Sequence, residues 1–412
     1  MTTAGDSRGG ELLAGGARFE REPGLLARLI APGFHKVLDK VDEGLEQGSI
    51  IGRLPDGTTR VLGRRNPGFE VEVTLHDWRG LMRLATNGSV GWYQAWEAGE
   101  WESPDPVSVF ALFSVNGTAL GDTGRAKGPF RWFARLAHWS NRNTHSGAER
   151  NIHAHYDLGN DFYAQWLDPS MSYSSAMFGP GDNLEQAQHR KWDRLAQRLG
   201  SPETILEIGC GWGSLADYLA GRGAKVTGIS LSEEQLAWAR ERHDKTIDFR
   251  KQDYRDVDEK FAAIVSVEMV EAVGREYWPS YFDCIAGSLQ SGGRAAIQYI
   301  SMEEPLFEAY AASADFIQAY IFPGGLLIKT SEFQKLAKER GLRWEDQQDF
   351  GMDYARTLQI WRENFDAALA QGRLPEGFDE KFARLWRFYL MYCEGGFRGG
   401  SIDVHQVTLI KE

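Results

Sequence analysis

The stretch Thr204–Ser214 reads T-I-L-E-I-G-C-G-W-G-S, a short apolar run that ends in an acid and is followed by three glycines at alternate positions. This pattern predicts a strand, a tight glycine-rich turn and the first turn of a helix. Gly209, Gly211 and Gly213 carry no side chain, so such a turn brings backbone N–H groups close to a ligand. We therefore predict a nucleotide-like cofactor at this turn.

The spacing of the glycines indicates which cofactor binds. The dinucleotide fingerprint requires G-x-G-x-x-G, whereas this stretch offers G-x-G-x-G and is preceded by Glu207. A carboxylate at the end of the strand repels a diphosphate, but it suits a ligand that carries an ammonium group near an adenosine. The pattern favours S-adenosylmethionine over a dinucleotide, and the alternative is an ordinary strand-to-helix turn without a ligand.

Composition bounds the class of protein. The chain has 412 residues, of which 42% are hydrophobic and 12% aromatic, so it is globular with room for more than one domain. A net charge of −12 argues against nucleic acid as a partner. Its three cysteines are widely spaced, which fits a reducing compartment, and no run approaches the roughly 20 apolar residues of a membrane span. We predict a cytoplasmic protein.

Apolar strands and amphipathic helices alternate in the second half of the chain, and this alternation predicts an α/β fold with a doubly wound, Rossmann-like parallel sheet. Ligands of such sheets bind at the carboxyl ends of the strands, near the point where strand order reverses. The predicted elements are a helix over 182–200 with a capping box at Asp182, strand 204–209, helix 214–222, strand 225–230, a helix capped by Ser232, strands 247–252 and 262–269, helix 277–289, strand 294–300 and a last strand over 401–411.

The strand ends name the candidate binding residues: Glu207, Ser230, Asp253 and residues 268–271. Asp253 is placed to read an adenine amino group, and Gln235, in the first turn of a helix, is placed to reach ribose hydroxyls. The alternative for both is local helix capping.

The N-terminal third has a different character. Alternation over residues 57–75 predicts two strands joined by a turn, and residues 77–106 combine helical spacing with four tryptophans that form either a core or a lipid-facing surface. Residues 125–142 hold five Lys or Arg and no acid, interleaved with aromatic residues. This composition is typical of a segment at a membrane interface, and the alternative is a solvated linker helix.

Five blocks of sequence resemble one known family. In chain order they are N-I-H-A-H-Y-D-L-G-N-D-F-Y from Asn151, L-E-I-G-C-G-W-G-S-L-A from Leu206, V-E-M-V-E-A-V-G from Val267, Y-I-F-P-G-G from Tyr320 and Y-C-E-G-G-F-R from Tyr392. Together they resemble the cyclopropane-fatty-acyl-phospholipid synthases and the related mycolic acid methyltransferases. The resemblance covers about residues 145–412, and the region before it resembles the lipid-binding domain of that family more loosely.

Composition predicts a disordered start over residues 1–20 and a basic aromatic linker over 125–150. The resemblance implies an N-terminal lipid-binding domain over 21–124 and an S-adenosylmethionine-dependent methyltransferase domain over 151–412. It implies an enzyme that transfers a methyl group to the double bond of a phospholipid acyl chain through a carbocation and gives a cyclopropane, the alternative being a methylene- or methyl-branched chain. It also implies peripheral association with the inner face of the cell membrane, and a homodimer.

The resemblance also assigns site residues. It places Tyr173 and Ser174 at the cofactor, and Cys393 at a position proposed as catalytic, for which a packing thiol is the alternative. It implies a bound bicarbonate that acts as the base, and the family carries a Cys and a His where this chain has Ser175 and Gln298. The positions that would hold bicarbonate are Ser175, Glu271, Gln298, Ile300 and Tyr320.

Two other hypotheses remain open from the sequence. One is a methyltransferase for a soluble small molecule, which would need neither the N-terminal domain nor the basic segment. The other is a lipid-binding protein without activity, because two of the five anion-site positions depart from the family pattern. The pair His153 and His155 lacks a third ligand at metal-binding spacing, so we predict no metal.

Overall fold

The computed structural model describes residues 8–17, 31–121, 158–313 and 315–412. The chain divides into two compact units, each built from three separate stretches. Unit 1 comprises Met1–Asn141, Pro305–Pro323 and Gly377–Ile402, and unit 2 comprises Arg142–Glu304, Gly324–Glu376 and Asp403–Glu412. The predicted basic linker over 125–150 lies outside the described residues.

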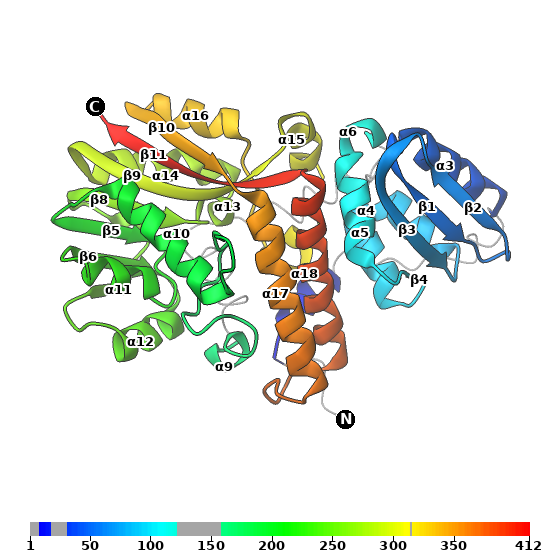
Figure 1. Cartoon of the computed structure of the whole chain (residues 1–412), viewed down its shortest axis with the longest axis horizontal. Helices are drawn as coiled ribbons and strands as arrows, with labels where there is room; N and C mark the ends of the chain where they lie inside the picture. Colours follow the sequence, from blue (N-terminus) through cyan, green and yellow to red (C-terminus); the bar gives the residue numbers. More distant parts are fainter. Residues whose placement is uncertain (1–7, 18–30, 122–157, 314) are drawn as a thin grey trace. The chain divides into compact units, whose positions relative to one another are not determined.

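Unit 2 is built on a seven-stranded sheet in the order β10-β11-β9-β8-β5-β6-β7 (Figure 1). Strands β5 to β9 are parallel along this order, and β10 pairs with β11 in antiparallel fashion. Strand order reverses beside β5, which has β6 on one side and β8 on the other. The strands are β5 (Thr204–Ile208), β6 (Lys225–Ser230), β7 (Asp248–Lys251), β8 (Phe261–Val267), β9 (Leu289–Met302), β10 (Leu342–Asp349) and β11 (Ile402–Lys411).

Helices pack on this sheet in two groups. Apolar residues of α10, α11 and α12 share one buried cluster with Ile205, Ala263 and Val265 of the sheet, while α14 contacts α16 and η1. The helical elements of unit 2 are α9 (Asn160–Tyr163), α10 (Leu184–Leu199), α11 (Ser214–Ala220), α12 (Glu233–Arg242), η1 (Tyr254–Asp256), α13 (Val270–Val273), η2 (Arg275–Tyr277), α14 (Trp278–Ser288), α16 (Thr330–Lys338) and α17 (Gly351–Ala370).

This architecture confirms the predicted doubly wound α/β fold, and each predicted element from residue 182 onward is present. The largest shift is in β9, which begins at Leu289 rather than at residue 294. The capping box of α10 is one residue later than predicted: Asn183 accepts a hydrogen bond from the Gln186 N–H, and the Gln186 side chain accepts one from the Asn183 N–H. A capping box needs a Glu or Gln three residues after the cap, and Gln186 meets this from Asn183.

Unit 1 combines a four-stranded sheet, in the order β2-β1-β3-β4, with helices. The predicted strands over 57–75 are present as β2 and β3, but they do not pair with each other because β1 lies between them. The elements are α1 (Gly10–Ala17), α3 (Ala31–Gly44), β1 (Gln47–Arg53), β2 (Thr59–Gly63), β3 (Asn66–Leu75), α4 (Arg79–Glu97), β4 (Trp101–Glu102), α5 (Pro106–Val115), α6 (Gly117–Leu120), α15 (Glu304–Ala311), η3 (Ile317–Ile321) and α18 (Glu380–Gly399).

Helices from the N-terminal third and from near the C-terminus pack together in the core of unit 1. Helix α18 packs against α5 at two glycines: a Cβ on Gly395 would lie 2.3 Å from Phe110 Cβ, and one on Gly399 would lie 2.4 Å from the Ala111 carbonyl oxygen. Trp101 stacks on Trp92 with ring centroids 4.2 Å apart. Both rings are buried, so these two tryptophans belong to a core rather than to a lipid-facing surface.

Two predicted parts of the chain need correction. Residues 10–17, predicted as part of a disordered start, form helix α1, because Leu12 is buried and Gly16 allows close approach to the Tyr320 ring. The methyltransferase domain was predicted as continuous over 151–412, whereas the compact unit excludes 305–323 and 377–402. The apolar face of α18 explains the second difference, because it is covered by α5 and α4 of unit 1.

Among the helices that the structure describes, none combines the length and the apolar character needed to cross a membrane.

Candidate active site

The glycine turn after β5 adopts a backbone that only glycine accepts readily. Gly209, Gly211 and Gly213 have φ of +80°, +52° and +85°. A Cβ on Gly209 would lie 2.3 Å from Met269 Sδ, and one on Gly213 would lie 2.7 Å from Phe249 Cζ. Around Gly211, by contrast, no described atom lies within 4 Å of the position of a Cβ. The turn is therefore closely packed at Gly209 and Gly213 and open at Gly211, as a site for a cofactor requires.

Glu207, the last but one residue of β5, is buried. Burial raises the pKa of its carboxyl to about 8, and the positive charge of Lys191 and the Ala216 N–H offset part of that rise. Its Oε2 has no hydrogen-bond partner among the described residues. A buried carboxyl oxygen without a partner fits a site completed by a ligand that carries donors, such as the ammonium or hydroxyl groups of S-adenosylmethionine.

A buried lysine lies in the same region, and sequence reasoning missed it. Lys191 of α10 is 1% exposed, and its Nζ donates a hydrogen bond to Ser174 Oγ at 2.7 Å. Burial lowers the pKa of Lys191 to about 8, against the charges of Glu268, Asp168 and Glu207. In the sequence it stands in Q-H-R-K-W-D-R, which is typical of a solvated helix face, so no local pattern distinguishes it from its neighbours.

Ser230 and Gln235, both predicted to bind the cofactor, lie together at the end of β6 and the start of α12. Ser230 Oγ lies 3.4 Å from Gln235 Oε1, and the Gln235 side chain is buried. Asp253 has the capping role that the sequence left open: it accepts hydrogen bonds from the backbone N–H of Arg255 at 3.0 Å and from the Arg255 guanidinium at 2.8 and 2.6 Å. A role for Asp253 in reading adenine stays a prediction.

Tyr173 lies in an aromatic cluster of unit 2. Its ring centroid is 5.5 Å from that of Tyr163 and 5.4 Å from those of Trp166 and Trp361. Ser174 follows it, buried, with its hydroxyl on Lys191. Tyr173 and Ser174 therefore connect this aromatic cluster to the buried side chain of Lys191.

Four hydrogen-bonding groups converge at the carboxyl end of β8. Glu268 Oε1 accepts hydrogen bonds from the backbone N–H of Ser175 at 2.9 Å and from Gln298 Nε2 at 2.8 Å. Glu268 Oε2 accepts one from the Tyr354 hydroxyl at 2.7 Å. Glu268 fell within the predicted strand end at 268–271, but sequence reasoning assigned it no role, and Tyr354 was missed entirely.

Glu271 lies three residues further on, in α13 (Val270–Val273). Its Oε1 accepts a hydrogen bond from the Ile300 N–H, and its Oε2 has no partner among the described residues. Burial, followed by the negative charge of Glu268, raises the pKa of Glu271 to about 8. Four of the five predicted anion-site residues, namely Ser175, Glu271, Gln298 and Ile300, therefore gather at this end of the sheet.

Tyr320 and Cys393 belong to unit 1 and are described within it. The Tyr320 hydroxyl accepts a hydrogen bond from Gln94 Nε2 at 3.3 Å, and its ring packs edge-on against Tyr93 at 4.6 Å. Burial, and then the charge of Asp315, raises the pKa of the Cys393 thiol. A thiol held in its protonated form is a poor nucleophile, which favours the packing role for Cys393.

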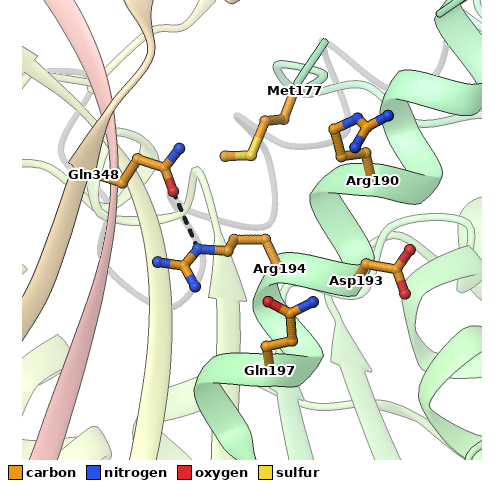
Figure 2. Close-up of a pocket in the computed structure, with 6 residues that line it drawn as sticks. All are labelled: Met177, Arg190, Asp193, Arg194, Gln197 and Gln348. Atoms are coloured by element: carbon orange, nitrogen blue, oxygen red, sulfur yellow. Dashed lines mark hydrogen bonds between the residues drawn. The ribbon is translucent and has the colours of Figure 1, made fainter. Parts of the chain in front are cut away.

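A pocket of about 340 Å³ opens beside α10, and Figure 2 shows Gln348 reaching toward Arg194 across it. Arg194 Nε donates to Gln348 Oε1 at 3.1 Å and also pairs with Asp346. The guanidinium of Arg190 pairs with Asp182. None of the predicted site residues lines this pocket, and its two arginines are already paired, so it is not the candidate active site.

The fold and the site together define a class. A doubly wound seven-stranded sheet with an antiparallel β10–β11 pair, an open glycine turn after the strand at the switch point and a buried acid beside that turn are the features of an S-adenosylmethionine-dependent methyltransferase.

Comparison with known proteins narrows this class. The family described as mycolic acid cyclopropane synthetase matches residues 143–407. The tuberculostearic acid methyltransferase UfaA1 of Mycobacterium tuberculosis is 39% identical over 359 residues, which are 80% of this chain and 81% of that protein. The cyclopropane-fatty-acyl-phospholipid synthase of Escherichia coli K12 is 36% identical over 258 residues, 62% of this chain and 66% of that protein.

Solved structures of cyclopropane synthases share the fold of this chain. The mycolic acid cyclopropane synthase CmaA1, complexed with SAH and CTAB, superposes with a TM-score of 0.59 at 28% identity, covering 64% of this chain and 98% of that one. The cyclopropane synthase MmaA2 from Mycobacterium tuberculosis gives a TM-score of 0.58 at 29% identity over the same shares. The chain belongs to the mycolic acid cyclopropane synthetase family, and is thus an S-adenosylmethionine-dependent enzyme of the kind that modifies lipid acyl chains.

Proposed function

We propose that the protein transfers the methyl group of S-adenosylmethionine to the double bond of an unsaturated acyl chain in a membrane phospholipid and forms a cyclopropane. The observation that carries the proposal is the anion site at the end of β8, where N–H groups of Ser175, Gln298 and Ile300 are directed at carboxylate oxygens. Methylation of an alkene produces a carbocation that must lose a proton, so an oxygen base held at such a site meets the need of this reaction.

The cofactor supplies an activated methyl group when bound. The residues that would hold it are those of the glycine turn with Glu207, the pair Ser230 and Gln235, and Ser174. Since the alkene attacks the methyl group directly, the chain needs no Ser or Cys nucleophile, and its tasks are alignment and exclusion of water. The aromatic cluster around Tyr173 suits a developing carbocation, at up to about 2 kcal/mol per dry ring face.

Whether a hydride shift precedes the loss of the proton decides the product. If it leaves the added methyl group directly, its C–H electron pair closes a cyclopropane ring, and if a hydride shift comes first, the same pair forms a methylene group. A saturated methyl branch requires a further hydride from a separate donor. The methyl-branched product is the second candidate, because the relative that covers 80% of this chain is named a tuberculostearic acid methyltransferase.

We also propose that the enzyme acts at the cytoplasmic face of the membrane. Support comes from the phospholipid in the name of the Escherichia coli relative and from the basic aromatic composition of residues 125–142.

The test is incubation of the full chain with S-adenosylmethionine and vesicles of unsaturated phospholipid. We expect S-adenosylhomocysteine to form, with a gain of one methylene unit in the recovered acyl chains, and none with fully saturated vesicles as the control. Proton NMR of the recovered lipid separates cyclopropyl from methylene hydrogens. Binding of S-adenosylmethionine without product on any unsaturated lipid would contradict the proposal and favour a lipid-binding protein without activity.

A further inference from the structure

We propose that the carboxylate of Glu268 is the base of this reaction, and that it fills the anion site which the family resemblance assigns to bicarbonate. The inference rests on the proposed function, because it identifies the base for that methyl transfer. It goes beyond it by placing the base within the chain itself.

The first support is where the donors point. The Ser175 N–H and the Gln298 amide, two of the groups that would hold bicarbonate, both donate to Glu268 Oε1, at 2.9 and 2.8 Å. Gln298 is itself fixed, because its Oε1 accepts a hydrogen bond from Gln406 at 3.0 Å. A bicarbonate at this place would have to displace the Glu268 carboxylate from both donors, so the residues present do not fit the added anion.

The second support is the balance of charge in the pair Glu268 and Glu271. Glu268 receives three hydrogen bonds and faces the buried ammonium of Lys191, whereas Glu271 receives one from a neighbouring residue, the Ile300 N–H. Hydrogen bonds and an opposite charge favour the ionised form of a carboxyl. Burial raises the pKa of Glu271 to about 8, so Glu271 stays neutral at pH 7, and of the two carboxyls Glu268 has the surroundings that better stabilise an anion. Burial raises the pKa of Glu268 above its usual value as well, which strengthens it as a base.

The third support is the backbone. Glu268 has a φ of +53°, a left-handed conformation that is unfavourable for a residue with a side chain. Its N–H is held by the Gln298 carbonyl at 2.8 Å. The next residue, Met269, packs directly on Gly209 of the cofactor turn. The strained conformation thus lies next in sequence to the residue that packs on the cofactor turn.

The step balances within the chain and its two substrates. The π electrons of the alkene form the bond to the methyl carbon, the electrons of the broken C–S bond stay on sulfur, and the second alkene carbon becomes a carbocation. A lone pair on Glu268 then takes a proton from the added methyl group, and the C–H electrons close the ring. If a hydride first moves from the methyl-bearing carbon to the carbocation, the same C–H electrons instead form the methylene double bond. Glu268 ends as a neutral carboxylic acid and returns the proton to water.

Two substitutions at one position test the proposal. Glu268→Gly removes the carboxylate and relieves the left-handed strain, so the fold is retained. Glu268→Gln keeps an oxygen acceptor for Ser175 and Gln298 but cannot accept the proton. Glu303→Gln, at an exposed carboxyl, is the matched control. We measure binding of [13C]bicarbonate from its NMR line width, and S-adenosylhomocysteine formation in carbon dioxide-free buffer with and without added bicarbonate.

The binding arm does not depend on turnover. We expect Glu268→Gly to broaden the bicarbonate signal, and the wild-type protein and Glu303→Gln to leave it unchanged. Equal broadening by the wild type, or none with Glu268→Gly, would overturn the proposal.

In the turnover arm, we expect the wild-type protein to form S-adenosylhomocysteine at the same rate with and without added bicarbonate. Glu268→Gln should lose about 10²- to 10⁴-fold in kcat with unchanged affinity for S-adenosylmethionine, and bicarbonate should rescue Glu268→Gly alone. Wild-type activity that requires bicarbonate, or full activity of Glu268→Gln, would refute Glu268 as the base. A wild type without activity on any lipid would instead refute the proposed function, while the binding arm would still decide what fills the anion site.

Discussion

Binding of S-adenosylmethionine should release a proton from Glu207. In the free protein the pKa of this carboxyl is raised to about 8 by burial, and its Oε2 has no partner among the described residues. At pH 6.5 the ratio of protonated to ionised Glu207 is then about 30 to 1. An ammonium or hydroxyl donor of the ligand stabilises the ionised form, so binding should expel about one proton per site.

The sign of the pH dependence follows directly. Because the ligand prefers ionised Glu207, and this form is scarce below pH 8, affinity should rise with pH by about tenfold per unit between pH 5.5 and 7. The ligand's own amino group, with a pKa near 7.7–8.0, is already protonated in this range and contributes little.

Calorimetry in two buffers of different ionisation enthalpy measures the released proton at pH 6.5. Glu207→Gln has no proton to lose and should show neither the release nor the pH dependence. Lys191→Met reports separately on the buried lysine whose pKa is lowered to about 8 and whose positive charge acts on Glu207. The reasoning fails if the wild type releases no proton, or if Glu207→Gln releases as much as the wild type.

Four further predictions concern single residues. Gly213→Ala should lose about 1–3 kcal/mol in urea unfolding, because its φ is +85° and the added methyl group meets the Phe249 ring; unchanged stability would contradict this. Trp101→Ala should destabilise unit 1 by about 3–5 kcal/mol, since its ring is fully buried, and a smaller loss would mean that the core can collapse around the gap. Cys393→Ala should keep turnover within a few-fold of wild type, as its thiol stays protonated, and a properly folded but inactive variant would restore a catalytic role. We expect the wild-type rate to decline above pH 8, where ionised Glu271 adds a second negative charge beside Glu268, and we expect Glu271→Gln to stay active near pH 7 and to lose this decline; an unchanged decline in the pH–rate profile would show that another group is responsible.

The sheet of unit 2 was predictable because each strand is apolar, short and bounded by turn residues, so that local pattern and final structure agree. The glycine turn and Glu207 were predictable for the same reason. Glycine residues indicate positive φ, and an acid near the end of an apolar run indicates a carboxylate at the end of a strand, so the local sequence shows both features. Ser175, Gln298 and Ile300 came from the family resemblance, and the structure gathers them at one strand end.

The remaining site residues depend on distant contacts. Lys191 is buried, and its hydrogen-bond acceptor is Ser174, 17 residues earlier. Tyr354 reaches Glu268 across 86 residues of sequence. A single sequence carries no local mark of either contact, since a lysine or tyrosine on a helix is normally solvated or packed in a core. The helix α1 was missed for a similar reason, because it packs against η3 and α18, which lie far along the chain.

The interleaving of the two units has a consequence for synthesis of the protein. The ribosome releases α4 and α5 early, but the helix that covers α5 is α18, which emerges only after nearly all of unit 2. The nascent N-terminal part must therefore wait, with an apolar helix face uncovered, until the C-terminal part of the chain has been made. For the same reason a fragment that begins at residue 143 would carry α18 without its partner, so the catalytic unit cannot be isolated by cutting the sequence only once.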